Sequence, residues 1–484
     1  MRNKTMSKQR FERRPLISAS YHELKEHKNN RRIWIEGETL NDVSFPVDTL
    51  FRVECDIDNM RVILRAVPST PENIALHKRR QLNKVSGRKM TGWIKPIIDV
   101  CNANITEVFK DAYGEQGRFA AYAYDGVIVF TTHPDDAKRI EREVSLVRNV
   151  ANGTITEGSA FTGIGISTNS THDGYQKAGL KPKLKWAVEL EGRYLDAAKK
   201  NSPEVFSGAR MFTGYVEEVE KDLIEPVNSF SFSMSCTDHS NVGKAKKGLS
   251  DAEEGETATQ IFGVMGLIYA ANPAILISEN VPSAKNSFTY KVLRKELERI
   301  GYNVYDLFLG QEHSGSLDRR ERYWFIAVSK GLNIDPQMLV PRTRDLVYKN
   351  VGEILDKNTN AEWFPLTKFE TRQAKNIAEG RNFKINLVDE NTTVVGTIPR
   401  NYTKHQVSNP HLTDHNGNYR LFSKEEHAAL KLVPPRLVGH MSATVAHEGL
   451  GQGIAYTHGV ECAFNVGTAV IAATQPQSQL RLAS

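Results

Sequence analysis

Two residues with reactive side chains each follow an apolar run that is typical of a buried strand. Cys236 comes just after residues 227–234 (VNSFSFSM), and Glu279 follows residues 274–278 (AILIS). A cysteine becomes a nucleophile when positive charge or backbone N–H groups stabilise its thiolate, and residues 237–248 after Cys236 include three lysines. A carboxyl group in a desolvated pocket has a raised pKa and can donate a proton. The pair predicts covalent catalysis, although either residue alone could be a buried small side chain or a strand-end carboxylate.

A glycine loop and a second carboxylate indicate a nucleotide-like ligand. Phe161, Gly163 and Gly165 belong to the stretch FTGIG, in which glycines let the backbone approach a ligand at a helix start. Glu189 ends the next strand-like run, KWAVE, where a carboxylate can accept hydrogen bonds from two ribose hydroxyls. Without the other motifs, a simple turn and an exposed strand-end glutamate explain these residues equally well.

Two arginines precede a further apolar strand. Arg320 and Arg322 lie in the stretch LDRRERYWFIAVS, and their planar guanidinium groups can donate paired hydrogen bonds to a carbonyl oxygen or a carboxylate. A surface cluster of ion pairs is the alternative interpretation. Gln452 lies in a glycine-rich segment, GLGQGIAYTHG, near the C-terminus.

Residues 151–331 alternate between strand-like and helix-like patterns. Strand-like runs include KWAVEL, VNSFSFSM, AILIS and RYWFIAVS, and helix-like runs cover residues 261–271 and 287–300. This alternation predicts an α/β fold with a mostly parallel sheet and helices on both faces. Ligands bind at the carboxyl ends of the strands in such sheets, and Cys236, Glu279 and Glu189 lie at or near such ends.

The chain as a whole divides into five regions. We expect a basic flexible arm (residues 1–33), an N-terminal accessory α+β domain (34–150), a catalytic domain (151–331), a recognition region (332–419) and a C-terminal segment (420–484). Asp125-Gly126 predicts a hairpin turn, and Ser423 with Glu426 predicts a helix that begins with a capping box. The basic cluster at residues 77–89 either assists DNA or partner binding or is a solvated face.

Several of these motifs together, in this order, resemble the cytosine-5-specific DNA methyltransferase family, with residues 158–470 covered. The ENV motif is matched in full, and four other motifs are matched with departures. Ser235 and Thr237 flank Cys236 where the family has proline and glutamine, and Ser159 replaces an acid before the glycine loop. Tyr215 lies where an acid usually contacts the cofactor, and Asp318 replaces the glutamine of the QxRxR motif. Matches near the C-terminus are Arg420, Ser423, Glu426 and Ala428 (ninth motif), Gly451-Gln452-Gly453-Ile454 (a variant of the tenth) and, more weakly, Thr397-Ile398 of the recognition domain.

The resemblance implies a Rossmann-like methyltransferase fold with a small target-recognition domain, and the C-terminal segment returns beside the glycine loop. It implies that S-adenosylmethionine binds at Phe161, Gly163, Gly165, Glu189 and Gln452. The target cytosine would be flipped out of double-stranded DNA. Cys236 would then attack carbon 6, Glu279 would support ring nitrogen 3, and Arg320 and Arg322 would orient the base. A restriction-modification system or the protection of a phage genome would use such an enzyme.

Two other functions remain open at this stage. One is methylation of cytosine in RNA by the same chemistry, and the other is DNA binding by a catalytically impaired homologue, which the departures at Ser159, Tyr215, Ser235 and Asp318 suggest.

Composition narrows the class of protein. The chain has 484 residues and a net charge of +6, and the four cysteines are widely spaced, which favours neither a zinc site nor a disulfide framework. It contains neither a long apolar run nor a signal-peptide pattern, so we expect a cytoplasmic protein. The resemblance implies that the cell is bacterial or phage-infected and that the protein lies near the nucleoid. We also expect no metal, no membrane contact and a monomer on DNA.

Overall fold

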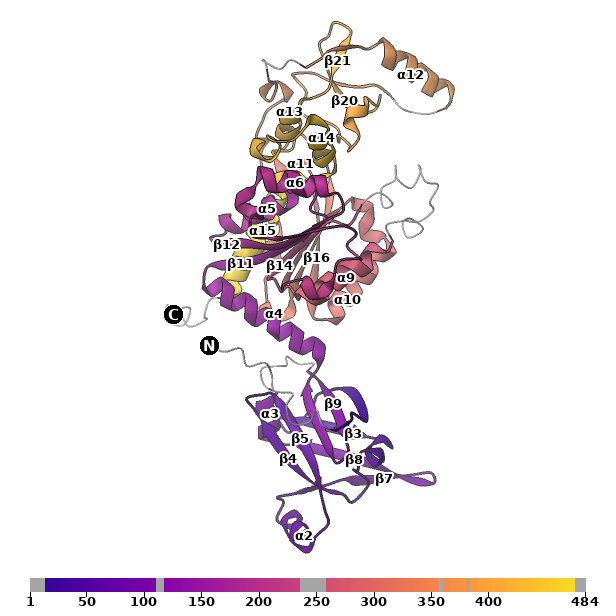
Figure 1. The fold of residues 1–484 in the computed structure, drawn as a ribbon, viewed down its shortest axis with the longest axis vertical. Coiled ribbons are helices and arrows are strands. Elements are labelled where there is room, and N and C mark those ends of the chain that lie inside the picture. Colours follow the sequence, from indigo (N-terminus) through magenta and orange to yellow (C-terminus); the bar gives the residue numbers. More distant parts are fainter. Residues whose placement is uncertain (1–13, 110–116, 236–257, 357–360, 381–383, 475–484) are drawn as a thin grey trace. The chain divides into compact units, whose positions relative to one another are not determined.

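The computed structural model describes residues 14–109, 117–235, 258–356, 361–380 and 384–474 (Figure 1). The chain forms two compact units, Met1–Glu141 and Arg142–Ser484. The division falls inside helix α4 (Pro134–Ala151), a little earlier than the boundary at residue 150 that the sequence suggested.

The first unit contains two antiparallel sheets with short helices. One sheet has the order β1-β9-β10-β5-β4-β6 and the other the order β2-β3-β8-β7. The strands of the first sheet are β1 (Ser18–Glu23), β4 (Leu50–Asp56), β5 (Arg61–Val67), β6 (Asn83–Lys84), β9 (Arg118–Tyr124) and β10 (Val127–Thr132). The second sheet is made of β2 (Lys25–His27), β3 (Asn30–Glu36), β7 (Ser86–Met90) and β8 (Trp93–Cys101), and the helices are α1 (Thr39–Asp42), α2 (Pro71–Lys78) and α3 (Ala103–Val108).

The expected hairpin turn is present in this unit. Tyr124 pairs with Val127, and Gly126 has a φ of +69°, so Asp125 and Gly126 form the two-residue connection between β9 and β10. The inner faces of both sheets share one apolar core, in which Ile33, Val62, Ile98 and Phe130 are buried.

The prediction of a flexible arm over residues 1–33 is wrong for its second half. Strand β1 pairs with β9 along its whole length, and β3 pairs with β8. Most of β1 is exposed to solvent, because it lies at the edge of its sheet and is held through backbone hydrogen bonds. The polar residues of this edge strand therefore concealed it in the sequence. Residues 1–13 lie outside the described part.

The second unit is built on a seven-stranded sheet with the order β13-β12-β11-β14-β15-β17-β16. Its strands are β11 (Thr154–Ala160), β12 (Lys181–Glu189), β13 (Arg210–Thr213), β14 (Ser229–Phe232), β15 (Ile275–Asn280), β16 (Tyr302–Leu309) and β17 (Arg322–Ser329). Pairs from β13 through to β15 are parallel, whereas β17 pairs antiparallel with both β15 and β16. The carboxyl ends of β11, β12, β14 and β15 therefore meet at one edge of the sheet.

Apolar residues on the central strands alternate between two separate cores. In β15, Ile275 and Ile277 belong to one core and Leu276 to the other, and β17 divides in the same way. One core packs against α5 (Ile166–Lys177) and α15 (Tyr456–Thr474), and the other against α9 (Gln260–Ala271) and α10 (Phe288–Arg299) (Figure 1). The sheet is therefore covered on both faces, which is why its strands read as continuous apolar runs.

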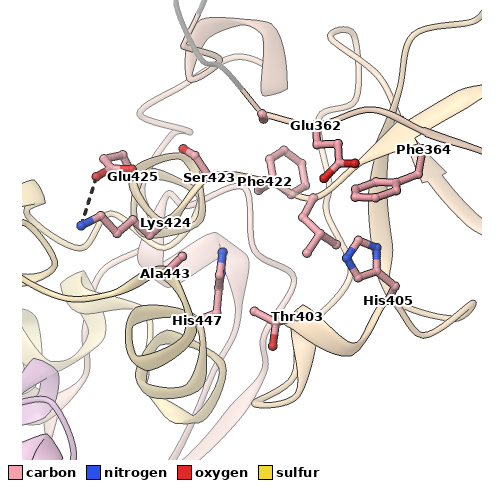
Figure 2. Close-up of a pocket in the computed structure, with 12 residues that line it drawn as sticks. Glu362, Phe364, Thr403, His405, Phe422, Ser423, Lys424, Glu425, Ala443 and His447 are labelled. Carbon is pink, nitrogen blue, oxygen red and sulfur yellow. Dashed lines mark ion pairs between the residues drawn. The ribbon is translucent and has the colours of Figure 1, made fainter.

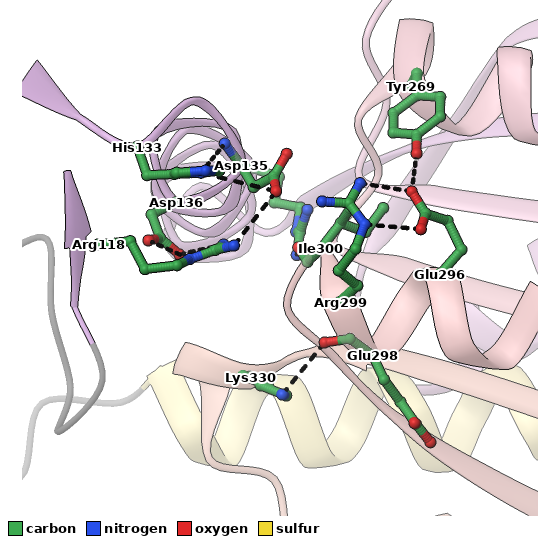
Figure 3. Close-up of polar contacts among 11 residues, drawn as sticks. Arg118, His133, Asp135, Asp136, Tyr269, Glu296, Glu298, Arg299, Ile300 and Lys330 are labelled. Carbon is green, nitrogen blue, oxygen red and sulfur yellow. Dashed lines mark hydrogen bonds and ion pairs between the residues drawn. The ribbon is translucent and has the colours of Figure 1, made fainter. Parts of the chain in front are cut away.

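Polar contacts add to the packing of α9 and α10. The Glu296 carboxylate on α10 accepts hydrogen bonds from the Tyr269 hydroxyl on α9 and from the Arg299 guanidinium (Figure 3). Among the described residues, no helix combines the length and apolar character that crossing a membrane requires.

A smaller sheet lies in the C-terminal half of this unit. It has the order β18-β21-β20-β19, formed by β18 (Phe364–Pro365), β19 (Asn386–Val388), β20 (Pro410–Thr413) and β21 (Asn418–Arg420), with α12 (Thr367–Ala378) beside it (Figure 1). The chain continues through α13 (Lys424–Leu430) and α14 (Ala443–Gln452) into α15. The predicted capping box is confirmed, since Ser423 Oγ accepts the Glu426 N–H and Glu426 accepts the Ser423 N–H.

The C-terminal helix α15 returns to α5, the helix that follows the glycine loop (Figure 1). The two backbones approach closely through glycines. A Cβ at Gly174 would lie 2.4 Å from the Val460 carbonyl oxygen, and one at Gly459 would lie 2.0 Å from Ser170 Oγ. The C-terminal segment therefore completes the same unit as the glycine loop.

Candidate active site

The glycine loop connects β11 to α5 through backbone conformations that most residues avoid. Phe161, Gly163 and Gly165 have φ values of +57°, +54° and +85°. For Phe161 this left-handed conformation is strained, and such strain is often found at functional loops. Gly165 is the N-cap of α5, and a Cβ there would lie 3.1 Å from both Ala198 and Phe206, whereas a Cβ at Gly163 would meet nothing within 4 Å. One side of the loop is therefore closed by packing and the other is open at Gly163.

Glu189, at the end of β12, faces this loop. Its Oε2 accepts a hydrogen bond of 2.7 Å from the Gly163 N–H, and its Oε1 accepts one of 3.1 Å from the Glu191 N–H. Burial raises the pKa of Glu189, and the backbone N–H groups oppose that shift by stabilising its anion. The structure thus brings Glu189 and the loop together, as a site for a ribose next to a backbone turn requires.

Hydroxyl groups take the place of the acid before the glycine loop. Ser159 Oγ lies 3.1 Å from Thr162 Oγ1 and 2.8 Å from Thr168 Oγ1, within hydrogen-bond distance, and all three are buried. A buried pair lies one turn away, with His172 Nδ1 2.8 Å from Glu157 Oε2. Sequence reasoning missed Glu157 and His172, because their contact joins a strand to a helix and neither belongs to a motif. The departure at Ser159 therefore leaves the start of the loop well fixed.

Glu279 and Arg322 form a buried ion pair at the edge where β15 ends and β17 begins. Arg322 Nε lies 2.7 Å from Glu279 Oε1, and the two side chains are only 11% and 8% exposed. The antiparallel pairing of β15 with β17 brings them together, since Asn280 pairs with Tyr323 and Glu279 with Trp324. Two residues that the sequence singled out separately are therefore direct partners.

Cys236 lies outside the described residues, but the residues before it lie next to Glu279. The Asn280 side-chain amide donates a hydrogen bond of 2.9 Å to the Met234 carbonyl oxygen, and a second of 3.1 Å to the Tyr290 hydroxyl. The Ser235 N–H donates to the Gln260 side chain at 2.9 Å, at the start of α9. The chain thus leaves the sheet toward Cys236 directly beside the strand end that carries Glu279.

Arg320 and Lys431 hold the turn that contains Gln452. Arg320 Nη2 donates to the Gly451 carbonyl oxygen at 2.8 Å, and Lys431 Nζ donates to the Leu450 and Gly453 carbonyl oxygens at 2.5 and 2.7 Å. Three backbone carbonyls around Gln452 are therefore bound by two buried cations.

Lys431 is wholly buried, and the carboxylate of Asp318 lies 3.9 Å from its Nζ. Burial lowers the pKa of Lys431 most, the neighbouring Arg320 lowers it further, and Asp318 opposes both. Sequence reasoning missed Lys431, because a lysine at a helix C-terminus is usually solvated. Asp318 is thus a partner for a buried lysine rather than an isolated substitution in the arginine motif.

Gln452 ends α14 and lies close to the residues that follow Glu189. Its side-chain amide is 3.2 Å from the Glu448 carbonyl oxygen and 3.5 Å from the Tyr194 hydroxyl. Tyr194 lies in α6 (Gly192–Asn201), shortly after β12. A Cβ at Gly449 would lie 2.5 Å from the Ile164 side chain, so α14 packs directly on the glycine loop. Of the five predicted cofactor residues, Phe161, Gly163 and Gly165 form the loop and Glu189 faces it. Gln452 lies on α14, the helix that covers the loop.

A separate cavity of about 380 Å³ contains none of the predicted site residues. It lies between the start of α13, the α14 residues Ala443 and His447, and the small sheet (Figure 2). Its lining includes His405, His447, Phe364 and Phe422, with Glu362 and Lys424. Burial lowers the pKa of His447 to about 4, so its ring is neutral near pH 7. Within the described ranges, no group of three or more His, Cys, Asp or Glu residues is arranged to hold a metal ion.

The fold and the site define a class of protein, and comparison with known proteins identifies the family. The model of the family C-5 cytosine-specific DNA methylase matches residues 161–460, which is more than half of the chain. The chain therefore belongs to this family. The unit Met1–Glu141 lies outside the match.

Individual relatives agree with this assignment. The chain is 25% identical over 246 residues to the Type II methyltransferase M.MspI of Moraxella sp, covering 50% of this chain and 56% of the relative. It is 24% identical over 230 residues to the Type II methyltransferase M.SsoII of Shigella sonnei, covering 46% and 58%. The chain thus spans little more than half the length of the curated relatives it matches.

A solved structure supports the fold alone. The Entamoeba histolytica methyltransferase EhMeth superposes with a TM-score of 0.51 at 14% identity, covering 64% of this chain and 96% of that chain. The expectation of a Rossmann-like methyltransferase fold is confirmed at this level.

Proposed function

We propose that the protein is a DNA cytosine-5 methyltransferase that transfers a methyl group from S-adenosylmethionine to carbon 5 of a flipped-out cytosine. One observation carries the proposal. The Asn280 side-chain amide donates a hydrogen bond to the Met234 carbonyl oxygen, and this bond connects the end of the strand that carries Glu279 to the segment that leads into Cys236. A nucleophile and a proton donor on these two strand ends are what attack on a pyrimidine ring needs. The family match over residues 161–460 includes both Cys236 and Glu279, which supports the proposal.

The glycine loop fits a nucleoside ligand. A carboxylate faces it from Glu189, its open side lies at Gly163, and α14 covers it through Gly449. Phe161, Gly163, Gly165, Glu189 and Gln452 would hold S-adenosylmethionine, which supplies the methyl group when it is bound. Glu189 would accept hydrogen bonds from the ribose hydroxyls, and the C-terminal turn held by Arg320 and Lys431 would close the site.

The reacting residues would act on a base that has left the duplex, because its ring is inaccessible inside the stack. The Cys236 thiolate forms a bond to carbon 6 while Glu279 donates a hydrogen bond or a proton to ring nitrogen 3. This places electron density on carbon 5, where the methyl group is accepted. Loss of the carbon 5 proton to solvent water then lets the bond from Cys236 to carbon 6 break, and any proton taken up by ring nitrogen 3 returns to Glu279. This leaves 5-methylcytosine and restores the Cys236 thiolate.

Arg322 would hold Glu279 in position during this sequence, and its guanidinium stabilises the carboxylate whenever the proton has left. Arg320 is bound to the Gly451 carbonyl in this structure, so we assign it first to positioning the C-terminal turn and, with Arg322, to orienting the base.

The target-recognition function is assigned to residues 332–419, which contain α12 and three of the four strands of the small sheet. The partner would be double-stranded DNA bound by a monomer without a metal, in the cytoplasm of a bacterial or phage-infected cell and near the nucleoid. The bacterial origin of the named relatives supports this setting, as do their names as Type II methyltransferases.

Labelled methyl transfer tests the proposal directly. Purified full-length protein with methyl-labelled S-adenosylmethionine should label duplex DNA, and Cys236→Ala should abolish the label while the fold stays intact. Cys101→Ala, which changes a cysteine of the other unit, is the matched control and should keep full activity. Labelling that survives in Cys236→Ala would exclude the covalent route.

Two further substrates distinguish the alternatives. DNA that contains 5-fluorocytosine should trap a covalent adduct, because fluorine at carbon 5 blocks the release of the cysteine, and an impaired homologue would trap none. Transfer RNA offered in parallel should stay unlabelled; preferential labelling of RNA would show that the nucleic-acid assignment is wrong. Bisulfite sequencing of DNA from expressing cells would then give the sequence context.

A further inference from the structure

The first unit carries a basic surface for which the family match gives no role. Residues 73–98 contain seven lysines and arginines and no aspartate or glutamate. The stretch covers the end of α2, strands β6 and β7, and most of β8. It is a folded part of the unit rather than a tail, so its cations are held at defined places on a surface.

Four of these seven cations have no ion-pair partner among the described residues: Lys78, Arg79, Arg80 and Lys89. The other three are paired, Lys84 with Asp48 and both Arg88 and Lys95 with Glu36. Several cations elsewhere in this unit are paired. Arg118 bonds to Asp136 and lies 3.6 Å from Asp135 (Figure 3), and Arg61 pairs with Asp56. Lys78, Arg79, Arg80 and Lys89 therefore carry positive charge that no described carboxylate neutralises through an ion pair.

A two-stranded ribbon formed by β7 and β8 projects from the first unit (Figure 1). All five residues of β7 are exposed, and so are Thr91, Gly92 and Ile94 of the turn and of β8. Met90 pairs with Trp93, which makes Thr91-Gly92 a two-residue turn, and Gly92 has the φ of +84° that such turns favour. At its base the ribbon is tightly packed, since a Cβ at Gly87 would lie 2.6 Å from Ile94 and 3.1 Å from Val47.

The shape and chemistry of the ribbon match duplex DNA. The major groove of B-DNA, about 12 Å wide, admits a two-stranded β-ribbon. Lysines and arginines flanking such a ribbon neutralise phosphates and release counterions. Lys89 lies opposite Ile94 on the two strands, so a cation and an apolar side chain are presented together. Because the turn is short and the base is packed, little conformational entropy is lost on binding.

A solvated surface is the alternative explanation, and it accounts for part of the charge. Lys78 lies in the last turn of α2, where positive charge is favoured by the helix dipole. It does not account for Arg80, which follows the helix with a φ of +62°, or for Lys89, which lies in the exposed strand β7. Arg80 and Lys89 are therefore the residues whose substitution best distinguishes a binding surface from a solvated one.

We propose that the surface formed by Lys78, Arg79, Arg80, Lys89 and the β7–β8 ribbon is a second contact with duplex DNA, outside the methyltransferase unit. This surface would add phosphate contacts that do not depend on the methylated sequence. It does not require the proposed reaction to occur.

The test measures DNA binding by the full chain at several salt concentrations. The probe is a 60-base-pair duplex, and the variant is Arg80→Gln with Lys89→Gln. The matched control is Lys25→Gln with Lys28→Gln, which removes two exposed cations from the other edge of the same sheet. Each phosphate contact contributes about 0.9 to the slope of log K against log salt, so the variant should lose about 1.8 from that slope and bind about tenfold more weakly.

The outcomes separate this proposal from the proposed reaction. Methyl transfer at saturating DNA should be unchanged in the Arg80/Lys89 variant, whereas Cys236→Ala should keep the full salt slope and lose transfer. The proposal would be overturned if the wild type and the variant had equal slopes of log K against log salt. It would also be overturned if the variant and the control lost equal amounts of slope and DNA affinity. If the variant lost binding only to vesicles of anionic lipid and not to DNA, the surface would belong to a membrane contact instead.

Discussion

Arg322 and Glu279 form an ion pair in which Arg322 Nε lies 2.7 Å from Glu279 Oε1, and the two side chains are only 11% and 8% exposed. If Glu279 supplies a proton to the cytosine ring, Glu279→Gln keeps the shape and removes the acid. We expect transfer to slow by a factor of about 10² to 10⁴, the usual contribution of a general acid, with DNA affinity little changed. Single-turnover methyl transfer is the measurement. Glu321→Gln, at an exposed neighbouring position, is the control and should retain full activity. If Glu279→Gln also retained full activity, Glu279 would have no part in proton transfer.

The carboxylate of Glu189 bonds to the Gly163 N–H and faces the loop assigned to the cofactor. In Glu189→Gln the side-chain oxygen can still accept that N–H, but the second carboxylate oxygen is lost for a ribose diol. We expect the Kd for S-adenosylhomocysteine to rise about tenfold, equal to about 1.4 kcal/mol, with kcat nearly unchanged at saturation. Calorimetry checks this, with Glu191→Gln as the control for loss of charge. An unchanged Kd would place the ribose elsewhere.

The pairing of Glu279 with Arg322 shows what a sequence can predict and where it stops. Both residues lie next to strongly apolar strands, so their presence at a sheet edge followed from local pattern. Their direct contact depends on β17 running antiparallel to β15, which periodicity does not encode. Strands β12, β14, β15 and β17 were predictable for the same reason, because residues buried on both faces leave an apolar run.

Lys431 and β1 were missed for a different physical reason. The environment of Lys431 is created by Asp318 and by the turn at 450–453, which are distant in sequence and meet it only in the folded chain. Strand β1 is stabilised by backbone pairing at a sheet edge, where side chains can be polar on both faces. A residue whose role depends on contacts with distant parts of the chain, or on backbone hydrogen bonds alone, is hard to recognise from the sequence around it.

Two glycines of the loop should respond differently to alanine. Both have positive φ, so each substitution is strained, by about 1 kcal/mol. At Gly165 the new Cβ would also press on Phe206 and Ala198 at 3.1 Å, whereas at Gly163 it would meet nothing within 4 Å. We expect Gly165→Ala to lower the free energy of unfolding by about 2–4 kcal/mol, since overpacking adds about 1–3 kcal/mol to the strain. Gly163→Ala should cost only about 1 kcal/mol and mainly weaken cofactor binding. Urea denaturation of both variants decides this, and equal losses of stability would contradict the packing argument.

Acid should destabilise the second unit through a buried histidine. Burial lowers the pKa of His411 to about 4, below its ordinary value of 6.5, and His405, Tyr402 and Tyr419 surround its ring. The folded state therefore binds fewer protons than the unfolded chain between about pH 4 and 6.5, so stability falls as the pH is lowered through this window.

In His411→Phe, an aromatic ring fills the same space without a titrating group. We expect a weaker dependence of the unfolding midpoint on pH between 6.5 and 4, measured by urea titration followed by circular dichroism. If His411→Phe kept the wild-type slope, His411 would contribute nothing to acid sensitivity.

The buried pair of Lys431 and Asp318 provides the last test, through a double-mutant cycle. Lys431→Met removes the donor to the Leu450 and Gly453 carbonyls and leaves Asp318 buried without its cation. The loss of one partner of a buried pair typically costs about 3–5 kcal/mol. The turn that contains Gln452 should loosen, so the Kd for S-adenosylhomocysteine should rise as well. In Lys431→Gln with Asp318→Asn, neutral side chains of similar size can bond to each other and to the same carbonyls, and much of the stability and affinity should return. Single Lys431→Gln and Asp318→Asn variants complete the cycle, and additive losses would show that the two residues act independently.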